Sequence, residues 1–107
     1  MAMGRHAAAR QVKQVRRETL VALKMLYPAA LMGEQLMRSL LILFPQLEWD
    51  YFRRDLVYLC EKGYIARVVA DNENDERATP WRKRWFRLTS EGVEIADHCI
   101  EDPALER

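Results

Sequence analysis

The stretch that decides the fold is Leu56-Val57-Tyr58-Leu59-Cys60-Glu61-Lys62-Gly63-Tyr64-Ile65, where a helical pattern changes into a strand pattern. Phe52, Leu56 and Leu59 are spaced i, i+4 and i+7, which predicts a helix from about residue 48 to 62 with one buried face. Gly63 follows the last turn, where a residue with positive φ commonly ends a helix. Residues 64–70 are rich in β-branched and aromatic side chains, so they predict a strand.

The sequence after this strand predicts a hairpin and one more helix. Residues 71–81 form a polar loop, and residues 82–88 alternate basic and apolar side chains as a second strand does. Thr89 is suited to cap the last helix because its hydroxyl can accept a hydrogen bond from a free backbone N–H. Glu91 in the first turn is favoured by the helix dipole, and Pro103 is expected to end the helix.

Two further helices are predicted upstream. The first runs from about residue 8 to 27, and Arg16, Arg17 and Lys24 are expected to turn outward. Its apolar stripe follows helical spacing and consists of Val12, Val15, Thr19, Leu23, Leu26 and Tyr27. Pro28 ends this helix because the residue before a proline disfavours the helical region. Residues 28–32 are expected to form an extended or turn link, and residues 33–44 a second amphipathic helix that Pro45 ends.

This order of elements, together with two motifs, resembles the winged-helix regulators of transcription. Residues 56–65 match the pattern Leu-x-x-Leu-x-x-x-Gly-aromatic-Ile that commonly closes their recognition helix. The segment Trp85-Phe86-Arg87-Leu88-Thr89-Ser90-Glu91-Gly92 looks like their second wing strand and the following helix start. The multiple-antibiotic-resistance and phenolic-acid-response families show the nearest pattern. A fainter resemblance is to small uncharacterised proteins of Mu-like prophages, which would make the chain phage-encoded.

The resemblance implies a mostly α fold: a winged helix-turn-helix with three helices, a two-stranded wing and a C-terminal helix. With 107 residues, half of them hydrophobic, the chain is expected to form one domain. We assign residues 9–103 to that domain, residues 1–8 to a flexible basic tail and residues 104–107 to a C-terminal tail. The sequence has no apolar run of the ~20 residues that a membrane span needs. A cytoplasmic protein with reduced cysteines is therefore expected.

The resemblance also implies that double-stranded DNA is a partner, contacted by the outer face of the third helix. Arg53 and Arg54 are candidates for guanine edges or phosphates, and Tyr58 for a phosphate. However, Glu48, Asp50, Asp55 and Glu61 outnumber Arg53, Arg54 and Lys62 on this helix. An acidic helix binds phosphates poorly, so the alternative is that Arg53 or Arg54 pairs with Asp50 on one solvated face.

Two other basic segments extend the candidate DNA interface. The second wing strand carries Arg82, Lys83, Arg84 and Arg87, with Trp81 and Trp85 beside them, which suits a wing lying against phosphates or in the minor groove. Acidic residues of the preceding loop could instead neutralise these charges. The N-terminal arm carries basic residues without any acid: Arg5, Arg10, Lys13, Arg16 and Arg17. This arm can track phosphates or serve only to keep the protein soluble.

Charge also suggests how two copies could associate. Residues 1–17 carry a charge of +5 and residues 91–107 a charge of −5, although the whole chain is only +1. These segments can attract each other within one chain or across a homodimer formed by the first and last helices. The runner-up function is a winged-helix module that binds another protein, for example a phage accessory or assembly factor. The sequence shows no catalytic motif, metal-ligand spacing or cofactor signature, so no enzyme activity is expected.

Overall fold

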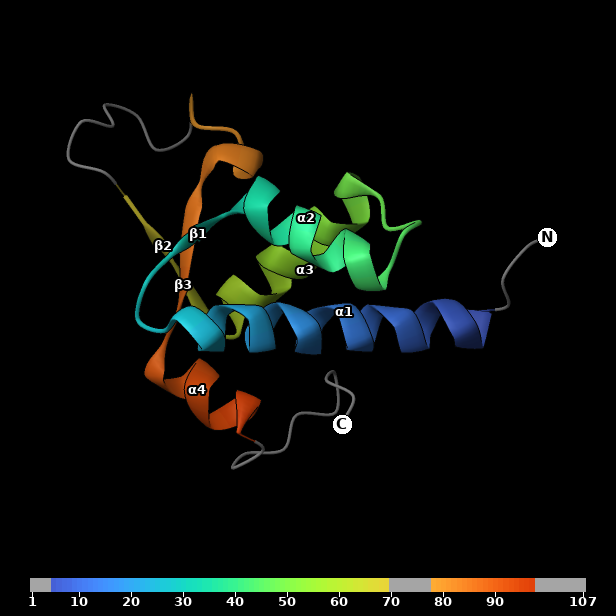
Figure 1. The fold of residues 1–107 in the computed structure, drawn as a ribbon, viewed down its shortest axis with the longest axis horizontal. Helices are drawn as coiled ribbons and strands as arrows, with labels where there is room; N and C mark the ends of the chain where they lie inside the picture. The colour runs from blue at the N-terminus through green and yellow to red at the C-terminus, as the bar shows by residue number, and fades with distance from the viewer. Residues whose placement is uncertain (1–4, 70–77, 98–107) are drawn as a thin grey trace.

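The computed structural model describes residues 5–69 and 78–97, with side chains described from residue 11 onward (Figure 1). The elements follow the order predicted from the sequence, with one strand and one short helix added. In chain order they are α1 (Arg5–Leu26), β1 (Leu31–Met32), α2 (Gly33–Leu43), α3 (Trp49–Glu61), β2 (Ile65–Val68), the 3-10 helix η2 (Trp81–Lys83), β3 (Trp85–Leu88) and α4 (Ser90–Ala96). The predicted end of the last helix at Pro103 lies outside the described residues.

The sheet has three strands rather than the two predicted for the wing. Its order is β1-β3-β2, and both pairings are antiparallel. Leu31 lies opposite Phe86 in the first pair, and Ile65 lies opposite Leu88 in the second. Residues 28–32 were predicted to be only a link because a two-residue strand is too short to show alternation. The strand is recognisable only through its partner β3, which lies far away in sequence.

The wing is also shaped differently from the prediction at its second strand. Residues 82–88 were predicted to be continuous strand, but Trp81–Lys83 forms one turn of 3-10 helix and β3 begins at Trp85. Pro80 precedes this turn with φ −65°, the backbone angle at which its ring is fixed. Arg82 and Lys83 therefore lie on a short helical turn packed against α2, not on a strand.

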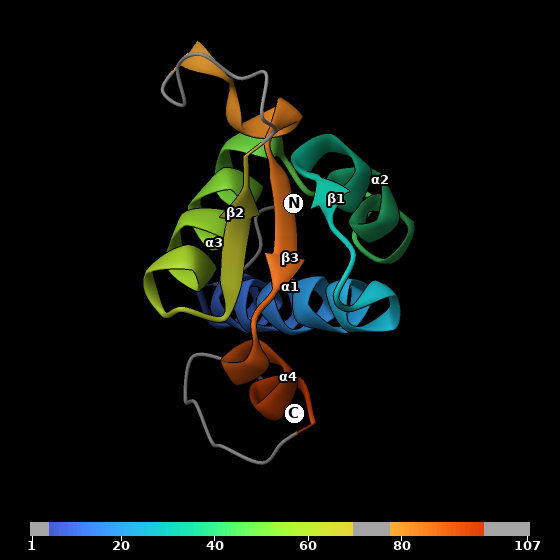
Figure 2. The same cartoon turned by 90° about the vertical axis from the view of Figure 1, so that its left-hand side faces the viewer.

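Helix α1 is the central support of the domain. Figures 1 and 2 show it between α4 on one side and α2 and α3 on the other, and it contacts all three as well as β3. It begins at Arg5, earlier than the predicted start at residue 8. Val15, Thr19 and Leu23 of the predicted stripe are at most 1% exposed, and Val12 is half-buried. The stripe prediction was wrong at the end of the helix, where Leu26 and Tyr27 are exposed.

The prediction that Arg16 and Arg17 face outward was wrong. Both side chains are half-buried, whereas Lys24 is exposed as predicted. Helix α1 is covered by other elements on several sides, so it leaves only a narrow solvent face. A prediction from one buried stripe assumes a helix covered on one side only.

The hydrophobic core fills the space between α1, the inner face of α3 and the sheet. Its fully buried side chains come from every layer: Leu23 of α1, Leu36 of α2, Phe52, Leu56 and Leu59 of α3, and Phe86 and Leu88 of β3. On β3 the exposed and buried residues alternate, with Phe86 and Leu88 turned inward and Trp85 and Arg87 outward. The burial of Phe52, Leu56 and Leu59 confirms the predicted inner stripe of the third helix, α3. It also determines which residues of α3 face the solvent.

Two backbone features close α3 and start α4 as the sequence predicted. Gly63 has φ +78°, so the chain turns from α3 into β2 through the left-handed region. The Thr89 hydroxyl accepts a hydrogen bond from the Gly92 N–H at 3.0 Å and lies 2.6 Å from the Gly63 carbonyl oxygen, to which it donates. This hydroxyl therefore caps α4 and joins its start to the turn that ends α3.

A different constraint acts on Gly33 at the start of α2. A Cβ atom at this position would lie 2.5 Å from the carbonyl oxygen of Trp81 and 3.3 Å from the Trp49 ring. The first of these atoms belongs to the backbone, so it cannot move aside without displacing η2. The absence of a side chain thus lets the beginnings of α2 and α3 and the η2 turn meet closely.

We predict that Gly33→Ala destabilises the protein more than Gly63→Ala does. Alanine at residue 33 overpacks a buried contact, for which a cost of about 1–3 kcal/mol or more is expected. Alanine at residue 63 meets nothing closer than 3.5 Å and suffers only the left-handed backbone cost, about 1–2 kcal/mol. Urea unfolding followed by circular dichroism measures both. Equal losses of unfolding free energy, or a larger loss for Gly63→Ala, would contradict the close contact between Gly33 and the Trp81 carbonyl oxygen.

Candidate nucleic-acid interface

The outer face of α3 carries the two arginines that the sequence singled out. With Phe52, Asp55, Leu56 and Leu59 buried, Arg53 and Arg54 are both exposed. The guanidinium carbon of Arg54 lies 5.7 Å from the centre of the Tyr51 ring, which is also exposed. Within the described residues neither arginine forms an ion pair, so the alternative pairing with Asp50 is not seen. Both side chains are available to a ligand.

Tyr58 has a different environment from these arginines. It is half-buried, and the guanidinium carbon of Arg16 lies over its ring, 3.8 Å from the ring centre. Cation–π stacking of this kind holds the ring against α1. The sequence placed Tyr58 on the open outer face, whereas the structure places it at the edge where α1 covers α3. Its contact with a phosphate stays a prediction.

The predicted basic residues of the wing divide into exposed and structural positions. Arg82, Lys83 and Arg87 are exposed, whereas Arg84 is half-buried. Arg84 donates from Nε to the Thr79 carbonyl oxygen at 2.8 Å, and its guanidinium lies 4.6 Å from the centre of the Trp81 ring. Arg84 thus shapes the wing. Lys83 pairs with Glu34 of α2 at 3.0 Å in an exposed ion pair.

Arg82 is brought to the beginning of α3 by a contact that the sequence did not reveal. Its guanidinium carbon lies 4.9 Å from the centre of the Trp49 ring. Trp49 and Arg53 are i and i+4 on one helix, so they occupy the same face in successive turns. Trp49 thus contacts Arg82 of η2 and shares a face of α3 with Arg53. We call the exposed residues Arg53, Arg54 and Arg82 the arginine face.

Trp81 and Trp49 both pack where η2 meets the beginning of α3. Trp81 stacks on the core residue Phe86 with the ring centres 5.6 Å apart, and Trp49 meets Phe52 edge to face at 5.9 Å. Both are half-buried. Trp85 has 37% of its surface exposed on β3.

The N-terminal arm is only partly described. Arg5 and Arg10 belong to the α1 backbone, but their side chains lie outside the described part of the chain. Lys13 is exposed. The acidic loop residues Asp71, Glu73, Asp75 and Glu76 also lie outside the described residues, so their predicted neutralisation of the wing stays a prediction.

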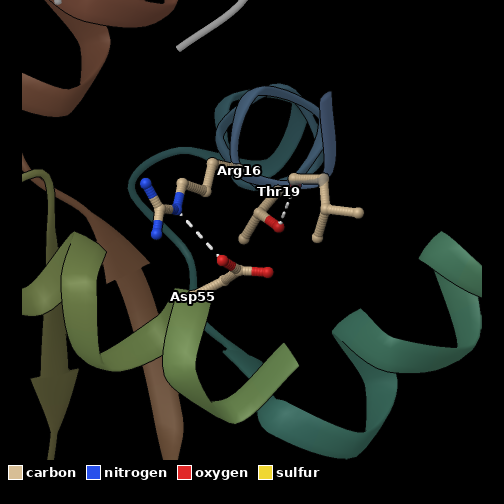
Figure 3. Close-up of polar contacts among 4 residues, drawn as sticks. Arg16, Thr19 and Asp55 are labelled. Carbon is tan, nitrogen blue, oxygen red and sulfur yellow. Dashed lines mark hydrogen bonds and ion pairs between the residues drawn. The ribbon is translucent and has the colours of Figure 1, made fainter. Parts of the chain in front are cut away.

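Sequence reasoning missed a buried ion pair behind the outer face of α3. Asp55 is 4% exposed, and its Oδ1 atom accepts a hydrogen bond of 3.0 Å from Nε of Arg16 (Figure 3). Desolvation raises the pKa of Asp55 from 3.8 to about 6, although the Arg16 hydrogen bond and charge act to lower it. The signal was present in the sequence, because Asp55 follows Phe52 by three residues and precedes Leu59 by four, so it lies on their face.

The remaining described residues offer no sign of a reactive or metal centre. Burial raises the pKa of the half-buried Cys60 thiol to about 11, which keeps it protonated and unreactive at neutral pH. Among the described residues, no group of three or more histidine, cysteine or carboxylate side chains could hold a metal ion. No described helix is both long enough and apolar enough to cross a membrane.

Solved structures of one regulator share this architecture. The oxidized form of MarR from E. coli superposes with a TM-score of 0.58 over 87% of this chain, at 14% sequence identity. The described chain has the winged-helix fold. A mutant of MarR from E. coli complexed with operator DNA superposes with the same TM-score over 88% of the chain, at 16% identity.

These similarities have a limited extent. The chain spans 63–64% of the length of the two MarR chains. No protein-family model and no curated protein matches the sequence. At such low identity the likeness concerns the fold, and the function has to be argued from the residues that the fold exposes.

The buried ion pair yields a prediction about pH. Because the folded-state pKa of Asp55 is above 3.8, the carboxyl adds stability that is complete below pH 3.8 and is lost as the pH rises through 6. Relative to Asp55→Asn, the wild type should gain about 1.4 kcal/mol of unfolding free energy between pH 7.5 and pH 5. Denaturant titrations of both proteins at the two pH values measure this gain. If the difference in unfolding free energy between wild type and Asp55→Asn does not change with pH, the raised pKa of Asp55 is contradicted.

Proposed function

We propose that this protein is a winged-helix DNA-binding protein that regulates transcription. The observation that carries the proposal is the arginine face: Arg53 and Arg54 are exposed on α3, and Arg82 of η2 is held at the beginning of α3 by its contact with Trp49. Arginine matches both phosphates and guanine edges with two hydrogen bonds. Support also comes from the fold, since the MarR mutant that superposes on this chain is complexed with operator DNA.

The local charge of α3 makes this face unusual for a nucleic-acid interface. Asp50 and Glu61 are exposed on α3 together with Arg53 and Arg54. Carboxylates near a phosphate backbone oppose binding, so we expect weak non-specific affinity. In the proposed complex, specific contacts come from Arg53 and Arg54 in the major groove. Arg82 and Arg87 contact the flanking phosphates, Tyr58 adds a phosphate contact, and Arg5 and Arg10 extend the basic surface.

We predict that replacing Arg53, Arg54 and Arg82 by alanine weakens duplex DNA binding at least about tenfold. The dependence of log affinity on log salt should also become shallower by about one for each phosphate that the variant no longer neutralises. The exposed side chains are replaced without filling or emptying the core, so the thermal unfolding temperature should hardly change. Fluorescence anisotropy with a labelled random duplex at several salt concentrations measures affinity and salt dependence, and circular dichroism measures the unfolding temperature.

Lys24→Ala is the matched control, because it removes one positive charge near α4, on the other side of α1 from α3. It should leave DNA affinity within about twofold of the wild type. An opposite-sign control is Asp50→Asn, which should strengthen binding by removing a carboxylate from the same helix. Undetectable wild-type binding at low salt and micromolar protein would rule out the proposal in favour of the protein-binding module. A phage-encoded origin stays a prediction.

We also propose that two copies associate through α1 and α4. Within one chain these helices already pack together, and Lys24 of α1 pairs with Asp97 after α4. Next to this pair, Met25, Leu26 and Tyr27 expose 81%, 46% and 43% of their surfaces. Contiguous apolar side chains of this kind are typical of a surface covered by a partner. A second copy would bury them.

We predict that light scattering gives about twice the single-chain mass of 12.6 kDa, and that Met25→Lys reduces it to that of the single chain. Ile42→Lys is the matched control, because Ile42 is also 81% exposed and belongs to α2, which lies on the other side of α1 from α4. A single-chain mass for the wild type at about 100 µM would end the dimer proposal. Equal effects of both substitutions would place the interface elsewhere.

A further inference from the structure

A cavity of about 520 Å³ lies on the side of α3 that faces the first half of α1. Its walls come from α1, from the end of α2, from the connection between α2 and α3, and from the first two turns of α3. The lining includes Val12 and Val15 of α1, Phe44 and Leu47 near the connection, and Tyr51 and Asp55 of α3. A volume of this size is typical of a site for a small organic molecule.

The walls of the cavity are mainly apolar. Val15 and Leu47 belong to the core, whereas Phe44 is half-buried and Tyr51 exposes 57% of its surface. Two aromatic rings and several aliphatic side chains therefore face the same space. Such a lining accepts a hydrocarbon or aromatic group whose transfer out of water is favourable.

The charged side chains in the cavity wall are both acidic. They are the buried Asp55 and Glu48 at the beginning of α3, and no lysine or arginine is among the described lining residues. A carboxylate attracts a cation most strongly where little water screens it, as at Asp55. Aromatic rings add attraction for a cation over their faces. The lining therefore favours a positively charged ligand over a neutral or negative one.

Asp55 has one oxygen to which no described residue donates a hydrogen bond. Its Oδ1 atom accepts the hydrogen bond from Arg16, and Oδ2 accepts none from the described residues. Figure 3 shows the second oxygen pointing away from the Arg16 guanidinium. A carboxylate of 4% exposure with only one oxygen bonded has an unmet capacity to accept hydrogen bonds. A donor inside the cavity would meet this capacity.

We propose that the cavity binds a small apolar amine. The ammonium group donates a hydrogen bond to Oδ2 of Asp55, while the apolar part lies against Phe44, Leu47 and Tyr51. Glu48 at the beginning of α3 adds a second negative charge that attracts the ammonium group. Binding of this ligand does not depend on the DNA-binding proposal, since the cavity and the arginine face share no residue.

A consequence for regulation does rest on the proposed function. Asp55 follows Arg53 and Arg54 directly on α3, and an amine on Oδ2 would share the carboxylate charge with Arg16 on Oδ1. Arg16 is the α1 residue that holds Asp55 and covers Tyr58. A bound amine therefore changes the contact between α1 and the helix that carries the arginine face, and would alter DNA affinity.

Three probes with one apolar body and different head groups test the binding site alone. These are 4-phenylbutylamine, 4-phenylbutan-1-ol and 4-phenylbutanoate, titrated by calorimetry at pH 7.5 without DNA. We expect saturable one-to-one binding of the amine, at least about tenfold tighter than the alcohol because its hydrogen bond is charge-assisted, and no binding of the carboxylate. Equal binding of amine and alcohol would overturn the proposal, as would no binding of the amine at millimolar concentration.

Matched variants locate the site. Asp55→Asn keeps the shape of the side chain and removes its charge, so amine affinity should fall about tenfold or more, to that of the alcohol. Asp50→Asn is the control, because Asp50 is exposed on the same helix and does not line the cavity. Val12→Phe fills the cavity from the α1 side, so it should abolish binding of both the amine and the alcohol. This variant tests the location of the site even if Asp55→Asn does not fold. Unchanged amine affinity in folded Asp55→Asn or Val12→Phe protein would refute the site.

Discussion

The burial of three side chains of α3 determines most of what this domain exposes. Phe52, Leu56 and Leu59 are fully buried against α1 and the sheet. A helix turns by a fixed angle per residue, so the residues that face the core also determine which residues face the solvent. Arg53 and Arg54 point to solvent because their neighbours on either side point inward. The candidate interface is thus a geometric consequence of the core, and a change in the core face would rotate it.

The outer face does not act alone, because its neighbours come from distant parts of the chain. Arg82 reaches Trp49 only because η2 packs against α2, and this packing depends on the small residue Gly33. Behind the helix, Arg16 holds Asp55 from α1. The backbone positions of the three exposed arginines are therefore fixed by contacts that stabilise the fold. The backbone of the candidate interface is set before any ligand arrives, which reduces the entropic cost of binding.

The sequence predicted those features that depend on nearby residues. The helical spacing in α3, the positive φ of Gly63 and the cap formed by Thr89 are local, and each was confirmed. It missed β1 and η2, whose positions depend on pairing with β3 and packing on α2. It also placed Arg16 in solvent, because the number of elements covering α1 cannot be read from α1 itself. The predicted exposure of Arg53 and Arg54 followed correctly from the inner stripe.

The short strand β1 restricts the movement of the wing relative to the helices. It leads directly into α2, where the Gly33 N–H donates to the Arg84 carbonyl oxygen at 2.9 Å, and it pairs with β3, the middle strand of the sheet. A rotation of the hairpin about its base would have to break these hydrogen bonds, so the helices and the base of the wing move as one stiff body. Adjustment to a partner surface then falls to the rotamers of long side chains such as Arg82 and Arg87, which can sweep several ångströms while the backbone stays still.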